Sequence, residues 1–269
     1  MTGARGTVFS VFGALLARLG RPVVAAARWA IDVCAMAAAI LMLAMRASSW
    51  RRTVTRAFAR DLRAALFGSL PAASVLAAMV GLGLVYQALY WLGSAGQISL
   101  IGEVIVTVLL RELAPMMVAL IVIGRSGTAL LIELTQQRTG GQLRTLDGQG
   151  IDPFLVYVVP RTLAFAVASF TLTILFIVAT LLFGFISASA LGVVQLSFHD
   201  FVDTTIATMS VGDFVILPAK SLALGFAIGV ICCHTALTHR RDATRVVASG
   251  FVRAVLAAVA VSGMLTLAI

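Results

Sequence analysis

Five long apolar segments are the feature that most restricts how this chain can fold. They span residues 70–93, 104–135, 154–190, 212–238 and 247–269. Each is long enough to cross a hydrocarbon core of ~30 Å as a helix that rises ~1.5 Å per residue. Only 12% of the residues are charged and 61% are hydrophobic, whereas soluble domains are roughly 25% charged. The sequence therefore predicts an all-α, polytopic integral membrane protein with a five-span core over residues 70–269.

Residues 1–69 predict a different relation to the membrane. The apolar stretch 23–45 has arginines on both sides, and residues 46–63 hold six Arg and one Asp. A single crossing would place one basic flank on the wrong side, because basic residues concentrate in cytoplasmic segments. We therefore expect an N-terminal interfacial or re-entrant helical region within one domain of residues 1–269. A further crossing by residues 23–45 is the alternative.

The loops alternate in charge and so predict an orientation. Loops 94–103 and 191–211 contain no Lys or Arg, whereas loops 136–153 and 239–246 contain two and three. Because short cytoplasmic loops are enriched in basic residues, the N-terminus is expected in the cytoplasm and the C-terminus on the opposite side. Five crossings agree with that arrangement.

The net charge of +9 comes almost entirely from arginine, since Lys220 is the single lysine among the 20 basic residues. On a soluble protein this charge would suggest nucleic acid. Here we interpret the arginines as topology signals beside anionic lipid, and we expect no nucleic-acid partner. A P-loop needs Gly-Lys before Ser or Thr, but Ala219 precedes Lys220. We therefore expect no cofactor in this chain, and any ATP hydrolysis would belong to a separate subunit.

Metal and enzyme sites have weak support. The three cysteines, Cys34, Cys232 and Cys233, lie in apolar surroundings, and neighbouring cysteines very rarely bridge each other, so no disulfide or metal site is predicted. A membrane enzyme would have to use the polar residues near one helix end, which are His234, His239 and Asp242. Two His and one Asp are a poor ligand set, so this is the least favoured hypothesis.

Charged residues inside the apolar segments point to a polar layer. Arg111 lies seven residues into its segment from the outer end, and Lys220 lies eight residues into its own. Both are therefore roughly 10–12 Å below the outer boundary, level with Glu112. Asp213 precedes Lys220 by seven residues and shares its helix face. The layer is either an internal ion-pair network or a site for an anionic headgroup, in which Arg and Lys would bind phosphate.

Two neighbouring features have both a structural and a functional interpretation. Gly124-Arg125-Ser126-Gly127 lies mid-span, where small residues favour close helix packing. In loop 136–153, Leu143 and Leu146 stand at i and i+3, with Arg144 and Asp147 beside them. This pattern predicts one or two turns of amphipathic helix, either as a solvated loop or as a docking helix that inserts its leucine face into a partner.

Several motifs resemble those of the MlaE/YrbE permease family, over roughly residues 65–250. The matching residues are Arg111-Glu112-Leu113-Ala114-Pro115, Gly124-Arg125-Ser126-Gly127, Glu133-Leu134, Arg138, Gln142, Leu146, Gly150-Ile151-Asp152-Pro153 and Val159-Pro160-Arg161. Lys220-Ser221, with Gly225 and Cys233, is similar to a later segment of that family.

This resemblance implies a permease subunit of an ABC transporter that moves phospholipid or a related lipid between the bacterial inner membrane and a periplasmic MCE-domain partner. It also implies a homodimer and a cytoplasmic ABC ATPase, with a small cytoplasmic STAS-domain subunit as a further candidate. The implied lipid-facing residues are Arg111, Glu112 and Lys220. We add Tyr86 and Tyr90, because with Gln87 they are the polar residues of the first apolar segment.

The segment that matches 136–152 corresponds to the family's coupling helix onto the ATPase. Its expected contact residues are Glu133, Arg138, Gln142, Leu143, Leu146 and Asp147. This chain departs from the family pattern at Gly140-Gly141 and over 242–247, both on the ATPase-facing side. Paired glycines weaken a helix interior by roughly 1 kcal/mol each, so we expect a shorter coupling helix or one that starts later. The alternative is a non-transporting scaffold of the same fold with lost or altered ATPase coupling.

Overall fold

The computed structural model describes residues 3–46, 50–85, 87, 90–91, 105–190, 198–238 and 243–267. Every regular element in these ranges is helical. In chain order the elements are α1 Gly3–Met45, α2 Arg52–Val80, η2 Gly81–Val85, η4 Ile105–Leu113, α5 Ala114–Val122, η5 Ile123–Gly127, α6 Thr128–Thr139, α7 Gln142–Gly148, η6 Phe154–Val158, α8 Val159–Ala190, α9 Phe198–Ala207, α10 Val211–Thr238 and α11 Ala243–Leu267. The η elements are wide π-helical turns within or next to the longer helices.

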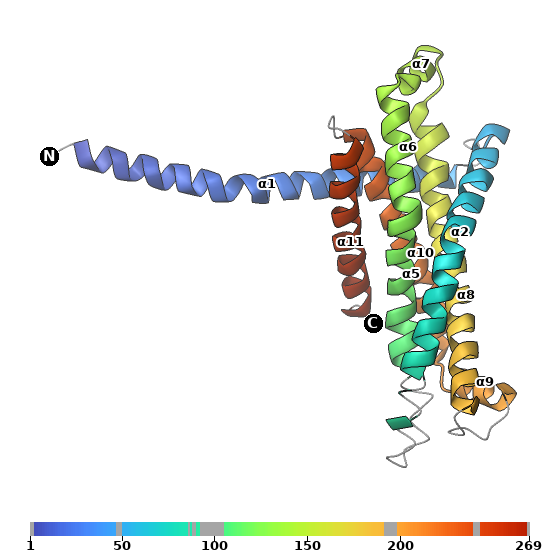
Figure 1. Ribbon diagram of the computed structural model, residues 1–269. Coiled ribbons are helices and arrows are strands. Elements are labelled where there is room, and N and C mark those ends of the chain that lie inside the picture. Colours follow the sequence, from blue (N-terminus) through green and yellow to red (C-terminus); the bar gives the residue numbers. More distant parts are fainter. Residues whose placement is uncertain are drawn as a thin grey trace.

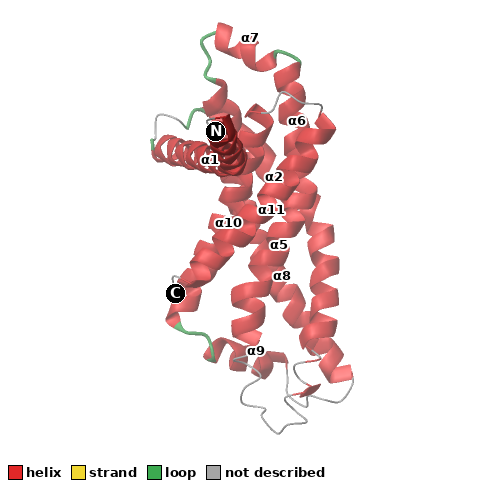
Figure 2. Cartoon of the chain, turned by 90° about the vertical axis from the view of Figure 1, so that its left-hand side faces the viewer, coloured by secondary structure: helices red, strands yellow, loops and turns green. Residues whose placement is uncertain are grey.

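Six helices of the described chain are long and apolar enough to cross a membrane, which confirms the predicted all-α, polytopic class. Five of them run lengthwise beside one another, whereas α1 runs across the bundle (Figures 1 and 2). In the most apolar 18 residues of the stretch Val24–Met45, only 6% are buried inside the protein. Whether α1 lies in the interface, re-enters or crosses the membrane stays a prediction.

The first helix of the bundle begins earlier than predicted. The apolar segment was expected from residue 70, but α2 starts at Arg52 and continues through η2 as one stretch to Leu84. Arg56 and Arg63 point outward, while the Asp61 side chain is mostly buried against the neighbouring helices. Long charged side chains on the outer face of a helix can extend toward water. The arginines of residues 52–69 made this stretch look too polar for the bundle, although it is part of α2.

The centre of the bundle is held by a very close approach of α8 and α10. A Cβ atom added at Gly225 would lie 2.4 Å from the carbonyl oxygen of Phe165, and one added at Gly229 would lie 2.9 Å from Thr162 Cα. Helices that cannot rely on a hydrophobic driving force in lipid gain from such contact between backbones. This packing fixes α10, and with it Lys220, against the rest of the bundle.

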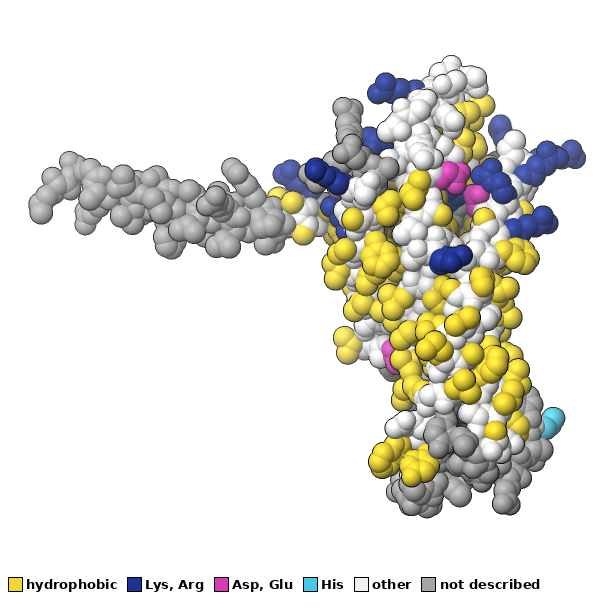
Figure 3. All heavy atoms as spheres, viewed as in Figure 1, with side chains coloured by type: hydrophobic (Ala, Val, Ile, Leu, Met, Phe, Trp, Pro, Cys, Tyr) yellow, Lys and Arg dark blue, Asp and Glu magenta, His cyan; other side chains and the backbone are white. Residues whose placement is uncertain are grey.

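The two ends of the bundle differ. One end carries α7 and the other carries α9 (Figure 1), and we call them the α7 end and the α9 end. Lysine and arginine side chains gather on the visible surface toward the α7 end (Figure 3). Basic side chains on the visible surface thus distinguish the α7 end from the α9 end.

Candidate functional site

The predicted polar layer exists and is joined by side chains from three parts of the chain. Arg111 and Glu112 lie in η4, Lys220 lies in α10, and Thr266 lies near the end of α11. Lys220 Nζ donates to Glu112 Oε2 at 2.8 Å and to Thr266 Oγ1 at 3.0 Å. The Thr266 hydroxyl also lies 2.9 Å from Glu112 Oε1. The layer therefore closes a small hydrogen-bonded ring between η4, α10 and α11.

Lys220 has a further partner that Pro115 makes available. In an α-helix the N–H of residue i+4 bonds the carbonyl of residue i, but proline has no N–H to donate. Pro115 therefore cannot bond the Arg111 carbonyl, and Lys220 Nζ donates to that oxygen at 3.0 Å. The Arg-Glu-Leu-Ala-Pro motif thus supplies both a side-chain and a backbone acceptor to one buried ammonium.

Arg111 is held by a second ion pair at the start of α10. Its Nη2 donates to Asp213 Oδ2 at 3.0 Å, and its Nε bonds Asp213 Oδ1. The same carboxylate accepts from the backbone N–H of Ser210 at 2.8 Å and from the Ser210 hydroxyl at 3.0 Å. Ser210 precedes the first residue of α10 and Asp213 is the third, so the Asp213 carboxylate makes the bond to the capping residue's N–H that is one half of a capping box. The cap that starts α10 therefore also aims Asp213 at Arg111.

The four charges balance within the chain but differ in access. The side chains of Lys220 and Asp213 are each 2% exposed, whereas those of Arg111 and Glu112 are 38% and 45% exposed. Two cations and two carboxylates satisfy each other, so the internal network that was one of the two interpretations is present. A ligand could reach only Arg111 and Glu112 without moving the chain.

Of the two tyrosines predicted to line this region, the structure describes Tyr90. Tyr90 is 53% exposed, and its ring packs edge-on to that of Trp91 with centroids 6.0 Å apart. Tyr86 lies outside the described residues. Their role in binding stays a prediction.

The coupling segment has the predicted helix, and its start is set by glycine. Gly140 ends α6, and Gly141 adopts the left-handed conformation with φ 77° before α7 begins at Gln142. Glycine adopts that conformation without steric penalty. The predicted one or two turns of helix are confirmed, because α7 covers Gln142–Gly148; that it is shorter than the family's coupling helix, or starts later, stays a prediction.

The leucine face of α7 is turned toward its own chain. Leu143 lines a cavity of about 330 Å³ together with Leu134, Tyr157 and Leu237. Leu146 is half-buried, whereas Gln142 and Asp147 are exposed. Arg144 and Asp147 line the same cavity as Leu143, and the surface of α7 that a partner would contact stays a prediction.

The C-terminal half of α6 is anchored to its neighbours. Arg138 Nη1 donates to the carbonyl of Ala236 in α10 at 3.3 Å. Glu133 bonds Arg161 of α8, whose side chain is 2% exposed, and Arg161 Nε also lies 3.4 Å from Asp61 Oδ2 in α2. A buried guanidinium between two carboxylates ties three helices together beside the coupling segment.

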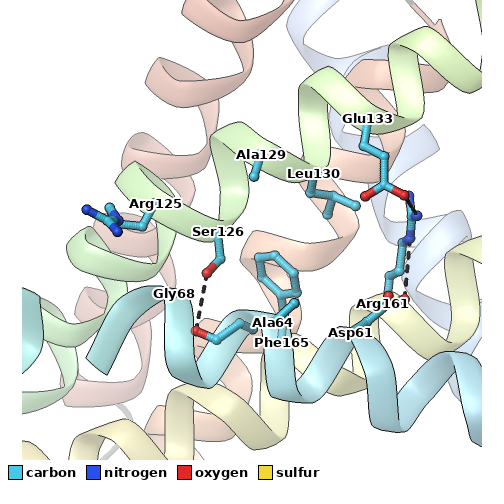
Figure 4. A pocket seen from close by; sticks show the side chains of 11 residues that line it. Asp61, Ala64, Gly68, Arg125, Ser126, Ala129, Leu130, Glu133, Arg161 and Phe165 are labelled. Atoms are coloured by element: carbon cyan, nitrogen blue, oxygen red, sulfur yellow. Dashed lines mark hydrogen bonds and ion pairs between the residues drawn. The ribbon is translucent and has the colours of Figure 1, made fainter. Parts of the chain in front are cut away.

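Next to this ion pair is a cavity of about 280 Å³ between α2, η5, α6 and α8 (Figure 4). Ser126, which lines the cavity, donates to the carbonyl of Ala65 at 3.3 Å, and its Oγ lies 3.0 Å from Ser69 Oγ. The expected packing role of the Gly-Arg-Ser-Gly motif holds for Gly127, where an added Cβ would lie 3.4 Å from Cys232 Sγ. It is wrong for Gly124, where an added Cβ meets none of the described atoms within 4 Å.

Sequence reasoning missed two members of these networks. Thr266 completes the ring around Lys220, and Asp61 shares Arg161 with Glu133. A lone threonine near the end of an apolar helix carries no sequence signal. Asp61 could have been suspected, because it is the one acidic residue among six arginines in 46–63. Of the residues considered for a metal, His239 and Asp242 lie outside the described residues.

Comparison with known proteins gives a family. A family model described as Permease MlaE matches residues 58–269, which is most of the chain. The chain belongs to the MlaE permease family. The matched part of this MlaE-family chain contains the polar layer, the Asp61–Arg161–Glu133 ion pairs and α7. It is therefore a multi-pass ABC transporter permease, a class that works with a separate ATPase.

Named relatives extend this picture. A probable ABC transporter permease protein of Rickettsia typhi is 27% identical over 203 residues, which is 75% of each chain. The intermembrane phospholipid transport system permease protein MlaE of Haemophilus influenzae is 36% identical over 77 residues, or 29% of this chain and 30% of that one. Protein TRIGALACTOSYLDIACYLGLYCEROL 1 of Arabidopsis thaliana, a chloroplastic protein, is 30% identical over 139 residues, or 51% of this chain and 39% of that protein.

Proposed function

We propose that this MlaE-family protein moves phospholipid, or a closely related lipid, between the bacterial inner membrane and a periplasmic MCE-domain partner. The observation that carries the proposal is a balanced charged layer inside an apolar bundle, with Arg111 and Glu112 exposed. Charges at such depth are unfavourable unless they serve a bound group or a packing network. Similarity to the Haemophilus influenzae phospholipid transport permease favours lipid as the bound group.

In this proposal the residues of the layer have different roles. Arg111 offers a planar guanidinium that can bind a phosphate through two N–H groups. Glu112 balances that charge and orients the headgroup. Lys220 is too buried to be a first contact, so it positions Glu112 and the Arg111 backbone from inside. Tyr90, and Tyr86 beyond the described residues, would line the approach.

The distribution of basic side chains supports an orientation with the α7 end in the cytoplasm. Lysine and arginine side chains gather on that part of the visible surface (Figure 3), as the positive-inside rule expects of a cytoplasmic side. The N-terminus would then be cytoplasmic, α1 would lie in the inner interface, and the C-terminus would be periplasmic.

The proposal assigns α7 to contact with a cytoplasmic ABC ATPase. Its exposed polar residues Gln142 and Asp147 would meet the partner, while Leu143 holds the helix against the bundle. Glu133 and Arg138 would transmit force through their bonds to α8 and α10. Two copies of this chain would form the transporter, and a small STAS-domain subunit is a further candidate partner on the cytoplasmic side.

A matched pair of substitutions tests the headgroup contact. Arg111→Ala removes the cation, whereas Asp213→Ala breaks the same ion pair and leaves the cation in place. We expect Arg111→Ala to lower both phospholipid co-purification and ATP-dependent lipid transfer, and Asp213→Ala to retain lipid binding. If Arg111→Ala and Lys220→Ala both bind and transfer lipid like the unsubstituted protein, the headgroup site is wrong.

A second candidate function is a membrane scaffold without ATPase coupling. It is motivated by Gly140-Gly141 and by residues 242–247, where the chain departs from the family pattern at the ATPase-facing side. Affinity purification from the native membrane separates the two functions. Recovery of a stoichiometric ATPase supports transport, and its absence under conditions that preserve the homodimer supports the scaffold.

A further inference from the structure

A large apolar groove lies between α1, α10 and α11, and its lining includes none of the residues of the polar layer. Its volume is about 750 Å³, within the range of ligand pockets. Trp29 and Cys34 contribute from α1, Phe226 contributes from α10, and Leu256 and Met264 contribute from α11. The groove is thus framed by the helix that runs across the bundle and by two that run along it (Figure 1).

One charged side chain stands in this apolar lining. Among the described residues that form the groove, Arg253 is the single ionisable cation. No carboxylate of the described chain lies within ion-pair distance of it, and its Nη1 is buried without a hydrogen-bond acceptor. Its guanidinium carbon lies 5.7 Å from the centre of the Trp29 ring. The chain therefore leaves this charge without an anion in an apolar setting, unlike Arg111 and Arg161.

The groove has the polarity pattern of a membrane lipid. On α11 its lining follows one helix stripe, from Arg253 through Leu256, Ala257 and Ala260 to Met264. The twelve residues from Arg253 to Met264 cover about 16 Å along the helix. The charged end lies beside Trp29 of α1, and the apolar part extends away from it. Tryptophan is enriched at the level of lipid headgroups, with acyl chains beyond.

We propose that this groove binds one glycerophospholipid, with its phosphate on Arg253 and an acyl chain along the α11 stripe. The site is separate from the layer around Lys220, and it belongs to the leaflet at which α1 lies. A second copy of the chain is a less suitable occupant, because a protein helix would bring no anion to Arg253 unless it carried a carboxylate at that depth. The phosphate of a lipid supplies the anion and the acyl chain fills the apolar part.

Cys34 provides a reporter inside the groove. It lines the groove and is exposed, whereas Cys232 and Cys233 are buried, so a bimane maleimide should label the full-length protein at one position. In detergent micelles, phosphatidylglycerol with brominated acyl chains should quench this bimane saturably. Brominated diacylglycerol, which lacks the phosphate, should need a concentration about tenfold higher, as expected for the loss of a charge-assisted hydrogen bond.

Matched variants assign the effect to Arg253. Arg253→Met should raise the half-saturating phosphatidylglycerol concentration about tenfold, whereas Arg28→Met, which removes an exposed arginine of α1 outside the lining, should not change it. Ala30→Phe, which fills the groove from α1, should abolish saturable quenching, and Ala27→Phe should not. Arg111→Ala should leave the quenching intact, so failure at this groove is distinguishable from failure of the proposed transport site.

Four results would overturn the proposal. These are equal quenching by the two brominated lipids, an unchanged titration with Arg253→Met in protein that still elutes as a folded species, and displacement of the brominated lipid by millimolar inorganic phosphate alone. The fourth is a bimane signal that depends on protein concentration and not on lipid, which would assign the groove to a second copy of the chain.

Discussion

Replacing Lys220 by methionine should destabilise the bundle, because this change leaves three acceptors without their donor. The side chain is 2% exposed, and its ammonium bonds the Arg111 carbonyl, Glu112 and Thr266. Removing one partner of a buried ion pair typically raises the free energy of the folded state by about 3–5 kcal/mol. Since the Glu112 side chain is 45% exposed, water can solvate part of what remains, and we expect about 2–3 kcal/mol here.

The assay is thermal unfolding of the full chain in detergent, followed by loss of monodisperse protein on size exclusion. A destabilisation of that size predicts a midpoint lower by roughly 5–10 °C. The double variant Lys220→Met with Glu112→Leu should recover much of the loss, because neither charge is then left unpaired. Arg63→Met, at an exposed position of α2, is the control and should behave like the unsubstituted protein. Equal midpoints for the single and double variants would refute the reasoning.

Three further predictions concern packing and the coupling segment. Gly225→Ala should prevent accumulation of folded protein, because its Cβ would lie 2.4 Å from a backbone oxygen, whereas Gly83→Ala, with open space around it, should express normally; similar yields in membranes would contradict this. Arg161→Met strands two carboxylates beside α8 and should lower the unfolding midpoint more than Arg63→Met does; an unchanged midpoint would show that the ion pairs contribute nothing. Gly141→Ala places a side chain at φ 77° and should destabilise the α6–α7 junction by about 1 kcal/mol. We expect it to lower the lipid-stimulated ATPase activity of the assembled transporter, whereas Gly148→Ala, with open space and no left-handed backbone, should not. Equal activities of the two variants would count against this role of the junction.

The sequence predicted the parts of the fold that depend on one helix at a time. Long apolar segments located five helices, and counting residues from their ends placed Arg111 and Lys220 at one depth, where the structure joins them through Glu112. This worked because the rise of a helix is fixed, so position in the sequence converts to depth in the membrane. The helix boundary at Gly140-Gly141 likewise follows from the sequence, since glycine backbone preferences act locally.

Features that depend on contact between helices could not be predicted. In the part of α2 that precedes residue 70, Asp61 pairs with Arg161, which lies 100 residues away in the sequence. The direction of Leu143 depends on the cavity that Leu237 helps to form. An amphipathic pattern states which residues share a face, but not whether that face meets the same chain or a partner.

The stretch from Val106 to Thr139 is one continuous helical rod of 34 residues, with the polar layer at one end and the junction to α7 at the other. At ~1.5 Å per residue the rod is about 50 Å long. If a rod of this length tilted rigidly by about 5° with the α7 end as pivot, its far end would be displaced by about 4 Å. Hydrogen bonds of about 3 Å do not survive such a displacement. A small rotation imposed at the α7 end would thus be enough to part Arg111 from Asp213 and to free its guanidinium for another anion.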